Sequence, residues 1–253
     1  MLHHPTLEKL YALRLVGMAK GFKEQENTPE VDSLSFEERL GLLVDREITD
    51  RENRKMRIRL KNAKLKMSAC MEDIDYRSPR GLDKALMAKL ASCDWIRAHH
   101  NVLVVGPTGT GKTYLACAFG QKACREGFTA IYRRLPRLFE ELDQAKGEGR
   151  HLKVLSALAK VDLLILDDWG LAPMAQEQRR DLLEILDDRH GNRSTLVTSQ
   201  FPVDHWHEMI GDATLADAIL DRLVHNAHKI KMKGESMRKR RATTKEPLTE
   251  TET

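Results

Sequence analysis

The sequence lacks the features that mark disulfide-bonded, membrane-spanning and secreted proteins. Its four cysteines form no C-x-x-C pair and lie in helical patterns, which predicts buried thiols in a reducing compartment. No apolar run reaches the roughly 18 residues of a membrane span, and no signal-like apolar segment opens the chain. We therefore expect a soluble, cytoplasmic protein without a membrane partner.

Metal-ligand and aromatic patterns are also sparse. The pairs His205/His207 and His225/His228 have no third ligand at a suitable spacing, so the sequence does not predict a histidine metal site. Aromatic residues make up only 5% of the chain, which leaves few platforms for stacking single-stranded bases.

Charge is abundant and nearly balanced, with 42 Lys and Arg against 38 Asp and Glu, but it is unevenly placed. Residues 51–66 and 229–241 are strongly basic, and another basic group follows the second predicted strand (Arg133, Arg134, Arg137, Lys146, Arg150 and Lys153). Such groups release counterions when they bind a phosphate backbone, which predicts duplex DNA as a partner. A solvated helix face is the alternative for any single cluster.

Residues 106–113 carry the sequence G-P-T-G-T-G-K-T between an apolar run, 101–105, and a helix-forming run that begins at Tyr114. This strand, glycine loop and helix form the context of a P-loop, whose N–H groups surround the phosphates of ATP. Lys112 is expected to reach the β- and γ-phosphates, and the Thr113 hydroxyl to bind Mg²⁺. The predicted nucleotide site comprises Gly106, Pro107, Thr108, Gly109, Thr110, Gly111, Lys112, Thr113 and Tyr114.

Two carboxylates follow the apolar run of residues 163–166, which predicts a buried central strand. The carboxyl end of that strand should lie beside the P-loop, where ligands of parallel sheets bind. We expect Asp167 to hold Mg²⁺ through its water shell and Asp168 to orient the attacking water. An aspartate is one methylene shorter than the more usual glutamate, which predicts slow hydrolysis. Two acids that merely end a strand are the alternative.

Residues 195–200 predict another buried strand that ends at the same edge. Ser199 is the candidate for sensing the γ-phosphate, with Thr198 and Gln200 as rivals. A serine that caps a turn at the strand end is the alternative.

Arg222 lies on the apolar face of a predicted helix over residues 214–227. Burying an unpaired guanidinium is very costly, so this arginine needs a partner. It is either an arginine finger that reaches the ATP of an adjacent subunit or one half of an ion pair with Asp217 or Asp221. Helix spacing alone does not decide between the two.

Strand and helix patterns alternate through the second part of the chain. Strands are expected near 101–106, 128–133, 162–167, 194–199 and 227–232, and helices near 112–125, 135–160, 175–190 and 213–226. This alternation predicts an α/β fold with a parallel five-stranded sheet and helices on both faces.

Helical patterns also precede the predicted sheet. One amphipathic stripe covers residues 6–26, and a capping box at Ser35–Glu38 starts a second helix that could run on to Met67. Ser78-Pro79 marks a plausible boundary. We expect an all-helical domain at 1–78 for partner or DNA binding, an ATPase domain at 79–240 and a disordered tail at 241–253.

Several motifs together resemble the IstB-type transposition helper ATPases, which are AAA+ proteins related to the DnaC and DnaA replication proteins. They are the P-loop, L-I-L-D-D-W-G, T-S-Q, L-A-D-A-I-L-D-R-L and K-G-E-S-M-R, with S-F-E-E-R-L-G-L-L-V-D-R-E and D-I-D-Y-R-S-P-R-G-L-D upstream. The resemblance spans nearly the whole chain to about Arg241.

The resemblance implies that ATP lies between subunits, that Arg222 acts in trans and that Arg238 is a second sensor of the nucleotide phosphates. It also implies ATP-dependent homo-oligomers on duplex DNA, DNA bending and delivery of a target site to a cognate transposase. In two respects the sequence departs from the wider superfamily: it leaves no room for a helical lid after the last strand, and Asp168 replaces a glutamate.

Two other functions compete with this one. A DnaC-like replicative helicase loader would use the same ATPase core, and its N-terminal domain would bind a helicase rather than a transposase. A small-substrate P-loop kinase would need an acceptor pocket and an arginine-rich mobile lid, and the sequence offers neither.

Overall fold

The computed structural model describes residues 4–237, which divide into two compact units between Arg59 and Leu60. The expected boundary lay at residues 78 and 79. Residues 60–78 instead contribute Ala63, Ala69, Met71 and Ile74 to the hydrophobic core of the second unit, so the units divide before them. Among the described residues, no helix combines the length and apolar character needed to cross a bilayer.

The first unit contains helices α1 (Pro5–Ala12) and α2 (Val16–Gln25), the short helix η1 (Pro29–Ser33) and most of α3 (Phe36–Ala63). The predicted single helix over residues 6–26 is wrong, because Arg14 has a φ of 60° and breaks it into α1 and α2. The capping box is present: Ser35 Oγ accepts from the N–H of Glu38, and the Glu38 carboxylate accepts from the N–H of Ser35.

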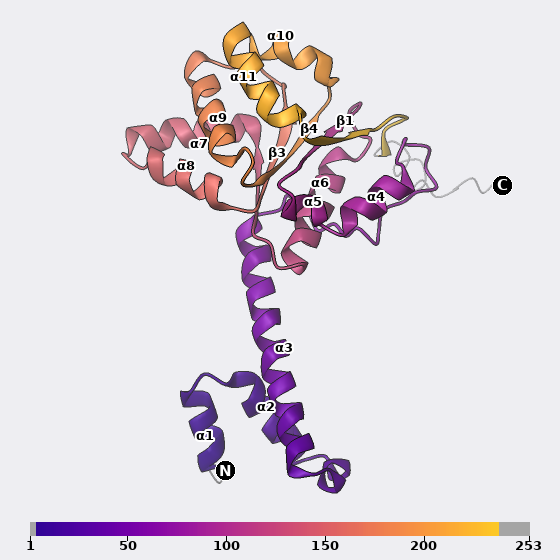
Figure 1. Cartoon of the computed structure of the whole chain (residues 1–253), viewed down its shortest axis with the longest axis vertical. Helices are drawn as coiled ribbons and strands as arrows, with labels where there is room; N and C mark the ends of the chain where they lie inside the picture. The colour runs from indigo at the N-terminus through magenta and orange to yellow at the C-terminus, as the bar shows by residue number, and fades with distance from the viewer. Residues whose placement is uncertain (1–3, 238–253) are drawn as a thin grey trace, which may run out of the picture. The chain divides into compact units, whose positions relative to one another are not determined.

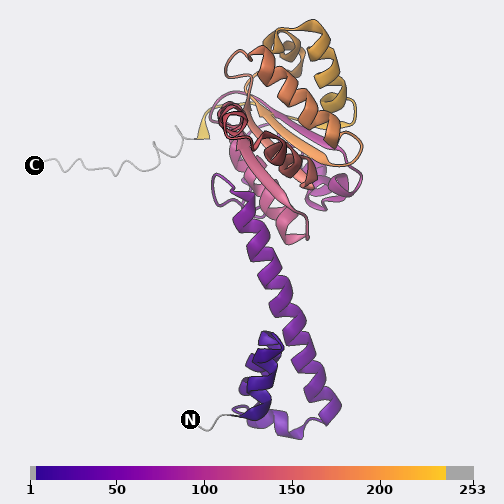
Figure 2. The same ribbon diagram turned by 90° about the vertical axis from the view of Figure 1, so that its left-hand side faces the viewer.

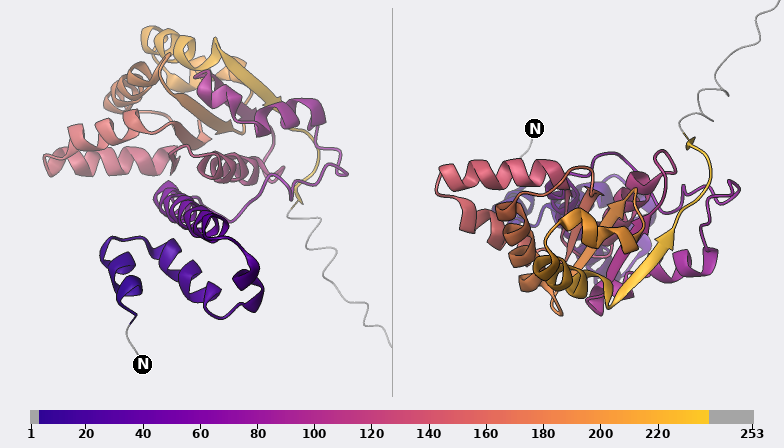
Figure 3. Two further views of the ribbon diagram at one scale, coloured as in Figure 1. Left: turned by 60° about the horizontal axis from the view of Figure 1, so that its bottom comes forward. Right: turned by 90° about the horizontal axis from the view of Figure 1, so that it is seen from above.

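In the second unit, α4 (Lys84–Ala91) and α5 (Asp94–Arg97) lead into a sheet whose five strands all run parallel in the order β2-β3-β4-β1-β5. The strands are β1 (Asn101–Val105), β2 (Ala130–Arg134), β3 (Leu163–Trp169), β4 (Ser194–Ser199) and β5 (Ala227–Lys231), with β5 at one edge (Figure 3). The predicted parallel five-stranded sheet is thus confirmed.

Helices cover both faces of the sheet, as predicted (Figure 1). Val102 and Val104 of β1 face α4, α5 and α6 (Lys112–Arg125), whereas Leu103 and Val105 face the opposite layer. That layer contains α7 (Leu135–Gly147), α8 (His151–Lys160), α9 (Gln176–Arg189), α10 (Trp206–Ile210) after the short η2 (Val203–His205), and α11 (Ala213–Val224). Helices α9 and α11 pack side by side (Figure 2).

The predicted single helix over 135–160 is also wrong, because Gly149 adopts a φ of 68° between α7 and α8. All four cysteines are free, and Cys93, Cys117 and Cys124 are buried as expected, whereas Cys70 is half-buried. Burial raises the pKa of Cys93 to about 11.

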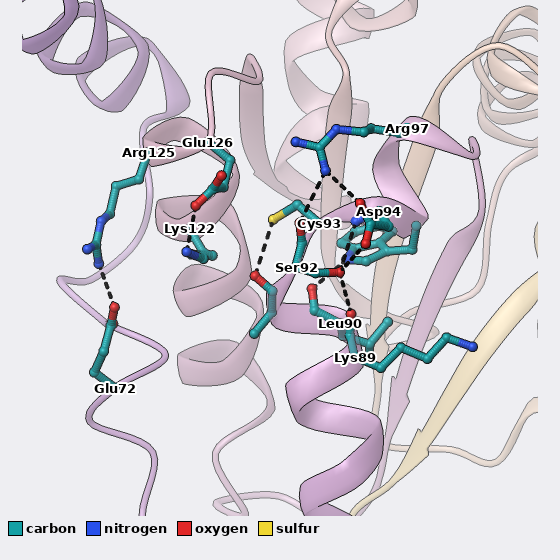
Figure 4. Close-up of polar contacts among 12 residues, drawn as sticks. Glu72, Lys89, Leu90, Ser92, Cys93, Asp94, Arg97, Lys122, Arg125 and Glu126 are labelled. Carbon is teal, nitrogen blue, oxygen red and sulfur yellow. Dashed lines mark hydrogen bonds and ion pairs between the residues drawn. The ribbon is translucent and has the colours of Figure 1, made fainter.

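The turn between α4 and α5 and the end of α6 are fixed by local polar contacts (Figure 4). Arg97 donates to Asp94 at 2.7 Å, and Arg125 donates to Glu72 at 2.8 Å. The Arg125 contact ties the segment before α4 to α6, which begins at the P-loop.

Candidate functional site

The glycine loop leaves β1 and is held against the segment that follows β5. Gly106, Gly109 and Gly111 have φ values of 154°, 85° and 101°, which a side chain would strain. A Cβ at Gly106 would collide with the backbone of Met232, and the N–H of Met237 donates to the Gly109 carbonyl at 2.9 Å. The loop is therefore shaped by close backbone contact on its outer side.

A cavity of about 510 Å³ opens beside this loop, within the size range of small-molecule sites. Three parts of the second unit line it: the segment before α4, the P-loop with the start of α6, and the carboxyl ends of the strands. The lining residues are Lys66, Met67, Asp73, Asp75, Arg80, Thr108, Gly109, Gly111, Lys112, Thr113, Tyr114, Arg134, Asp168, Leu171, Gln200 and Met237. Six of the nine predicted nucleotide-binding residues lie in this wall.

Lys112 is 9% exposed at the start of α6. Its Nζ donates to the carbonyls of Gly106 at 2.6 Å and Pro107 at 2.9 Å. Burial lowers the pKa of Lys112, and the charges of Asp167 and Asp168 oppose that shift. The ammonium thus lies inside the loop, where a phosphate chain would offer it better acceptors.

Asp167 is fully buried, and three hydroxyl groups donate to its carboxylate. They belong to Thr113 at 3.0 Å, Tyr132 at 2.5 Å and Thr198. Burial and the bond to Asp167 raise the pKa of Tyr132, so this phenol stays a donor.

The predicted metal ligands Thr113 and Asp167 are therefore in contact. Hydroxyl and carboxylate oxygens suit Mg²⁺, which takes one or two protein ligands and completes its shell with water and phosphate. The described residues contain no cluster of three or more His, Cys, Asp or Glu side chains that would hold a metal without a phosphate.

Asp168 has a φ of 64°, in the left-handed region, at an irregularity in the pairing of β3 with β4. Its N–H donates to Thr198 Oγ1 at 3.2 Å, and its carboxylate accepts from Arg134 Nε at 2.6 Å. The turned backbone directs Asp168 toward the cavity while Asp167 stays buried. Adjacent acids thereby acquire different surroundings.

The basic group in the core is partly paired within the unit. Arg134 lines the cavity and pairs with Asp168, Arg133 pairs with Glu141 at 2.8 Å, and Lys146 pairs with Asp181 at 2.8 Å. Arg137 and Lys153 of the same group are exposed. A contact between this group and DNA stays a prediction.

Ser199 does not face the cavity, contrary to the expectation that it senses the γ-phosphate. It is fully buried, donates to the Trp169 carbonyl at 3.0 Å and accepts from the N–H of Phe201 at 3.1 Å. The two other candidates, Thr198 and Gln200, lie closer to the cavity and to the aspartates. Gln200 lines the cavity and accepts from Thr108 Oγ1 at 2.6 Å, and Thr198 contacts both aspartates.

Arg222 is not part of this cavity. Its backbone carbonyl accepts from Asn101 Nδ2 at 3.0 Å, at the end of β1 opposite to the P-loop. The guanidinium pairs with Asp187 of α9, at 2.5 Å, and not with Asp217 or Asp221, the partners named in the ion-pair alternative. Arg238, the predicted second sensor, and the predicted tail 241–253 lie outside the described residues.

Arg80, which precedes α4, lines the cavity but was not among the site residues predicted from the sequence. This side chain is 8% exposed, and it donates to the carbonyls of Thr110 at 3.2 Å and Asp75 at 2.5 Å. It therefore supports the P-loop from the wall of the cavity. No periodicity marks Arg80 in the sequence, and its neighbours Ser78 and Pro79 suggested only a boundary.

Comparison with known proteins identifies relatives across the chain. The family described as IstB-like ATP binding protein matches residues 8–245. An insertion sequence ATP-binding protein of Sinorhizobium fredii, y4pL, is 56% identical over 94% of this chain and 98% of its own length.

Solved structures show the same fold at low identity. DnaI matches with a TM-score of 0.56 and 22% identity, over 70% of this chain and 93% of its own. The DnaC helicase loader matches with a TM-score of 0.50 and 19% identity, over 69% and 99%. The predicted AAA+ P-loop fold is thereby confirmed.

Proposed function

The chain belongs to the IstB-like ATP-binding protein family, a family of P-loop ATPases, and from that premise we propose that it assembles on duplex DNA in an ATP-dependent manner and helps a transposase to insert at target sites. The observation that carries the proposal is that the P-loop, Thr113 and Asp168 line one cavity, with Asp167 buried in contact with Thr113. Its cognate transposase and further copies of the chain are the proposed protein partners.

Five residues at or beside the cavity have a proposed role in hydrolysis. Lys112 and the loop N–H groups hold the β- and γ-phosphates, and Asp168 orients the attacking water. Thr113 and Asp167 would hold Mg²⁺, which neutralises charge on the phosphate oxygens when bound. We assign sensing of the γ-phosphate to Gln200 rather than to Ser199, because Gln200 lines the cavity.

We assign Arg222 to the nucleotide of a neighbouring subunit. It lies at the end of β1 away from its own P-loop, so it cannot complete its own site without a large movement. An arginine supplied in trans stabilises transition-state charge and makes hydrolysis depend on assembly. In the single subunit the guanidinium pairs with Asp187 and donates to the Ala218 carbonyl, and the ATP of a neighbour would replace these partners.

DNA binding is assigned to basic residues in the second half of α3 and to Lys64, which directly follows this helix. Arg57, Lys61 and Lys64 form no ion pair with residues that the structure describes, unlike Arg54 and Lys55, which pair with Asp50 and Glu52. Each phosphate contact that these three residues make lowers affinity as salt rises, with a slope of about −0.9 per contact.

A shift assay on duplex DNA with ATP, ADP or no nucleotide tests the proposal, with oligomers visualised by microscopy. We expect oligomers on DNA with ATP alone, and none with the Lys112→Ala variant. Equal binding in all three conditions would contradict the ATP switch.

A replicative helicase loader is the second candidate, because the fold matches DnaC and DnaI. The insertion sequence relative at 56% identity favours transposition. Pull-down with the N-terminal unit present separates the two: a transposase supports the first function, and a replicative helicase supports the second.

A further inference from the structure

A second lysine, Lys66, lines the nucleotide cavity from the segment that follows α3. Its Nζ lies 3.9 Å from Asp167 Oδ2, and Asp167 in turn contacts the Thr113 hydroxyl. Lys66 therefore lies at the end of the cavity where Thr113 and the two aspartates meet. The sequence placed this lysine within the basic stretch 51–66 that was expected to contact DNA.

The backbone that carries Lys66 is fixed to the core. Lys64 has a φ of 49° and ends α3, and Leu65 packs against Gly120 of α6 and Ile165 of β3. The N–H groups of Lys66 and Met67 face the buried sulfur of Cys117, and Ala63 and Ala69 are buried on either side. The ammonium thus extends from an anchored segment, which reduces the entropy lost when it binds a ligand.

Asp167 does not use up the donors of Lys66. Three hydroxyl groups already donate to the Asp167 carboxylate, and the 3.9 Å separation exceeds hydrogen-bond distance. The side chain is 38% exposed, so its three N–H donors are accessible from the cavity. An accessible cation beside Lys112 and the Thr113–Asp167 pair suits an anion with several oxygens.

We propose that Lys66 binds the terminal phosphate of ATP within its own subunit, as a second cation beside Lys112. This inference rests on the proposed ATPase function and deepens it. It assigns Lys66 to recognition of the γ-phosphate, so the residue distinguishes ATP from ADP. The DNA-facing part of the basic stretch then ends at Lys64.

Equilibrium binding of fluorescent ATP and ADP analogues to the full chain, without DNA, tests the assignment. A charged hydrogen bond to the γ-phosphate predicts that Lys66→Ala weakens ATP binding by about 10- to 100-fold and ADP binding by about twofold or less. Lys66→Arg should retain most of the ATP affinity. Lys89→Ala is the matched control, because Lys89 is an exposed lysine of α4 that does not line the cavity, and it should leave both affinities unchanged.

Equal losses for ATP and ADP, or an ATP affinity like that of Lys89→Ala, would overturn the assignment. If circular dichroism shows that Lys66→Ala is unfolded, Lys66→Met replaces it in the binding test, because methionine keeps the aliphatic part of the side chain without its charge. Lys112→Ala distinguishes a failure of the Lys66 assignment from a failure of the proposed ATPase function. If Lys112→Ala abolishes ATP binding and Lys66→Ala does not weaken it, only the Lys66 assignment fails; if the wild-type chain binds no ATP, the proposed function fails.

Discussion

At the scale of single residues, two adjacent aspartates are made different by the backbone that carries them. Asp167 is buried under three hydroxyl donors, whereas the φ of 64° at Asp168 directs the next carboxylate to the cavity and to Arg134. Burial suits the first for holding a cation with its neighbour Thr113. Access to the cavity suits the second for orienting water.

This difference predicts distinct effects of substitution. Asp168→Asn should lower ATP hydrolysis by about 100-fold or more, because the amide is a poor proton acceptor, and should leave ATP affinity within about threefold. Steady-state phosphate release and nucleotide titration measure the two quantities. Hydrolysis at the wild-type rate would remove Asp168 from the mechanism.

The end of β4 offers a second residue-scale prediction. Ser199→Ala should lower the free energy of unfolding by about 1–3 kcal/mol, because the buried carbonyl of Trp169 loses its donor, and should not alter the preference for ATP over ADP. Gln200→Ala should alter the preference for ATP over ADP and leave the free energy of unfolding nearly unchanged. Thermal unfolding and nucleotide titration of both variants decide the matter, and a changed ATP preference in Ser199→Ala alone would restore Ser199 as the sensor.

Site residues were predictable from sequence where they are contiguous and not where the fold assembles them. Lys112 and Thr113 belong to one loop whose spacing determines its geometry, and Asp167 follows an unmistakable buried strand. Ser199 and Gln200 are adjacent in the sequence at the end of β4, and the local turn there determines which of the two side chains faces the cavity. Arg80 is brought to the loop only by tertiary packing.

At the scale of elements, the contact of α2 with α3 depends on glycine. A Cβ at Gly17 would lie 2.6 Å from Glu47 Cα and 2.7 Å from the Arg46 carbonyl oxygen, too close for either backbone to accommodate. The Glu47 carboxylate also accepts from the N–H groups of Gly17 at 2.7 Å and Met18 at 3.1 Å, so α3 caps the start of α2.

Gly17→Ala should therefore loosen α2 from α3, at a cost of about 1–3 kcal/mol for overpacking. Gly41 of α3 is the control, because a Cβ there meets nothing within 4 Å, and its replacement by alanine should stabilise the helix by about 0.5–1 kcal/mol. Hydrogen exchange of amides in residues 16–25 measures the effect. Equal protection in the two variants would refute close packing at Gly17.

The Glu47 cap also predicts a dependence on pH. Burial opposes ionisation of Glu47, but hydrogen bonds from Arg51, Met18 and Gly17 prevail, and its pKa lies below the ordinary 4.5. The stabilisation is thus fully present above pH 4.5 and is lost as the pH falls through the lowered pKa. The protection factors of the α2 amides, which correct for the pH dependence of intrinsic exchange, should fall over that range in the wild type and not in Glu47→Gln; an unchanged response in the variant would assign it to another group.

Elements were predicted well where periodicity was long and poorly where one residue broke it. The five strands follow from apolar runs between helix patterns, so the sheet could be predicted. Arg14 and Gly149 interrupt apolar stripes that continue on both sides, and the sequence predicted one helix where the structure has two. Left-handed residues of this kind leave hydrophobic spacing intact.

At the scale of the whole molecule, the proposed mechanism of hydrolysis depends on whether a neighbouring subunit completes the ATP site. Arg222 lies at the opposite end of β1 from its own P-loop, and Asp187 pairs with it there. Asp187→Ala removes the ion pair and keeps the guanidinium, so it is the control for effects on packing alone.

Mixing two inactive variants on duplex DNA tests this claim most directly. Lys112→Ala subunits would lack bound ATP and keep Arg222, whereas Arg222→Ala subunits would bind ATP without a finger. We predict that each variant alone hydrolyses little ATP, that Asp187→Ala stays active, and that the mixture of the first two regains hydrolysis. A mixture no more active than the sum of its parts, or an Arg222→Ala protein as active as the wild type, would contradict the account.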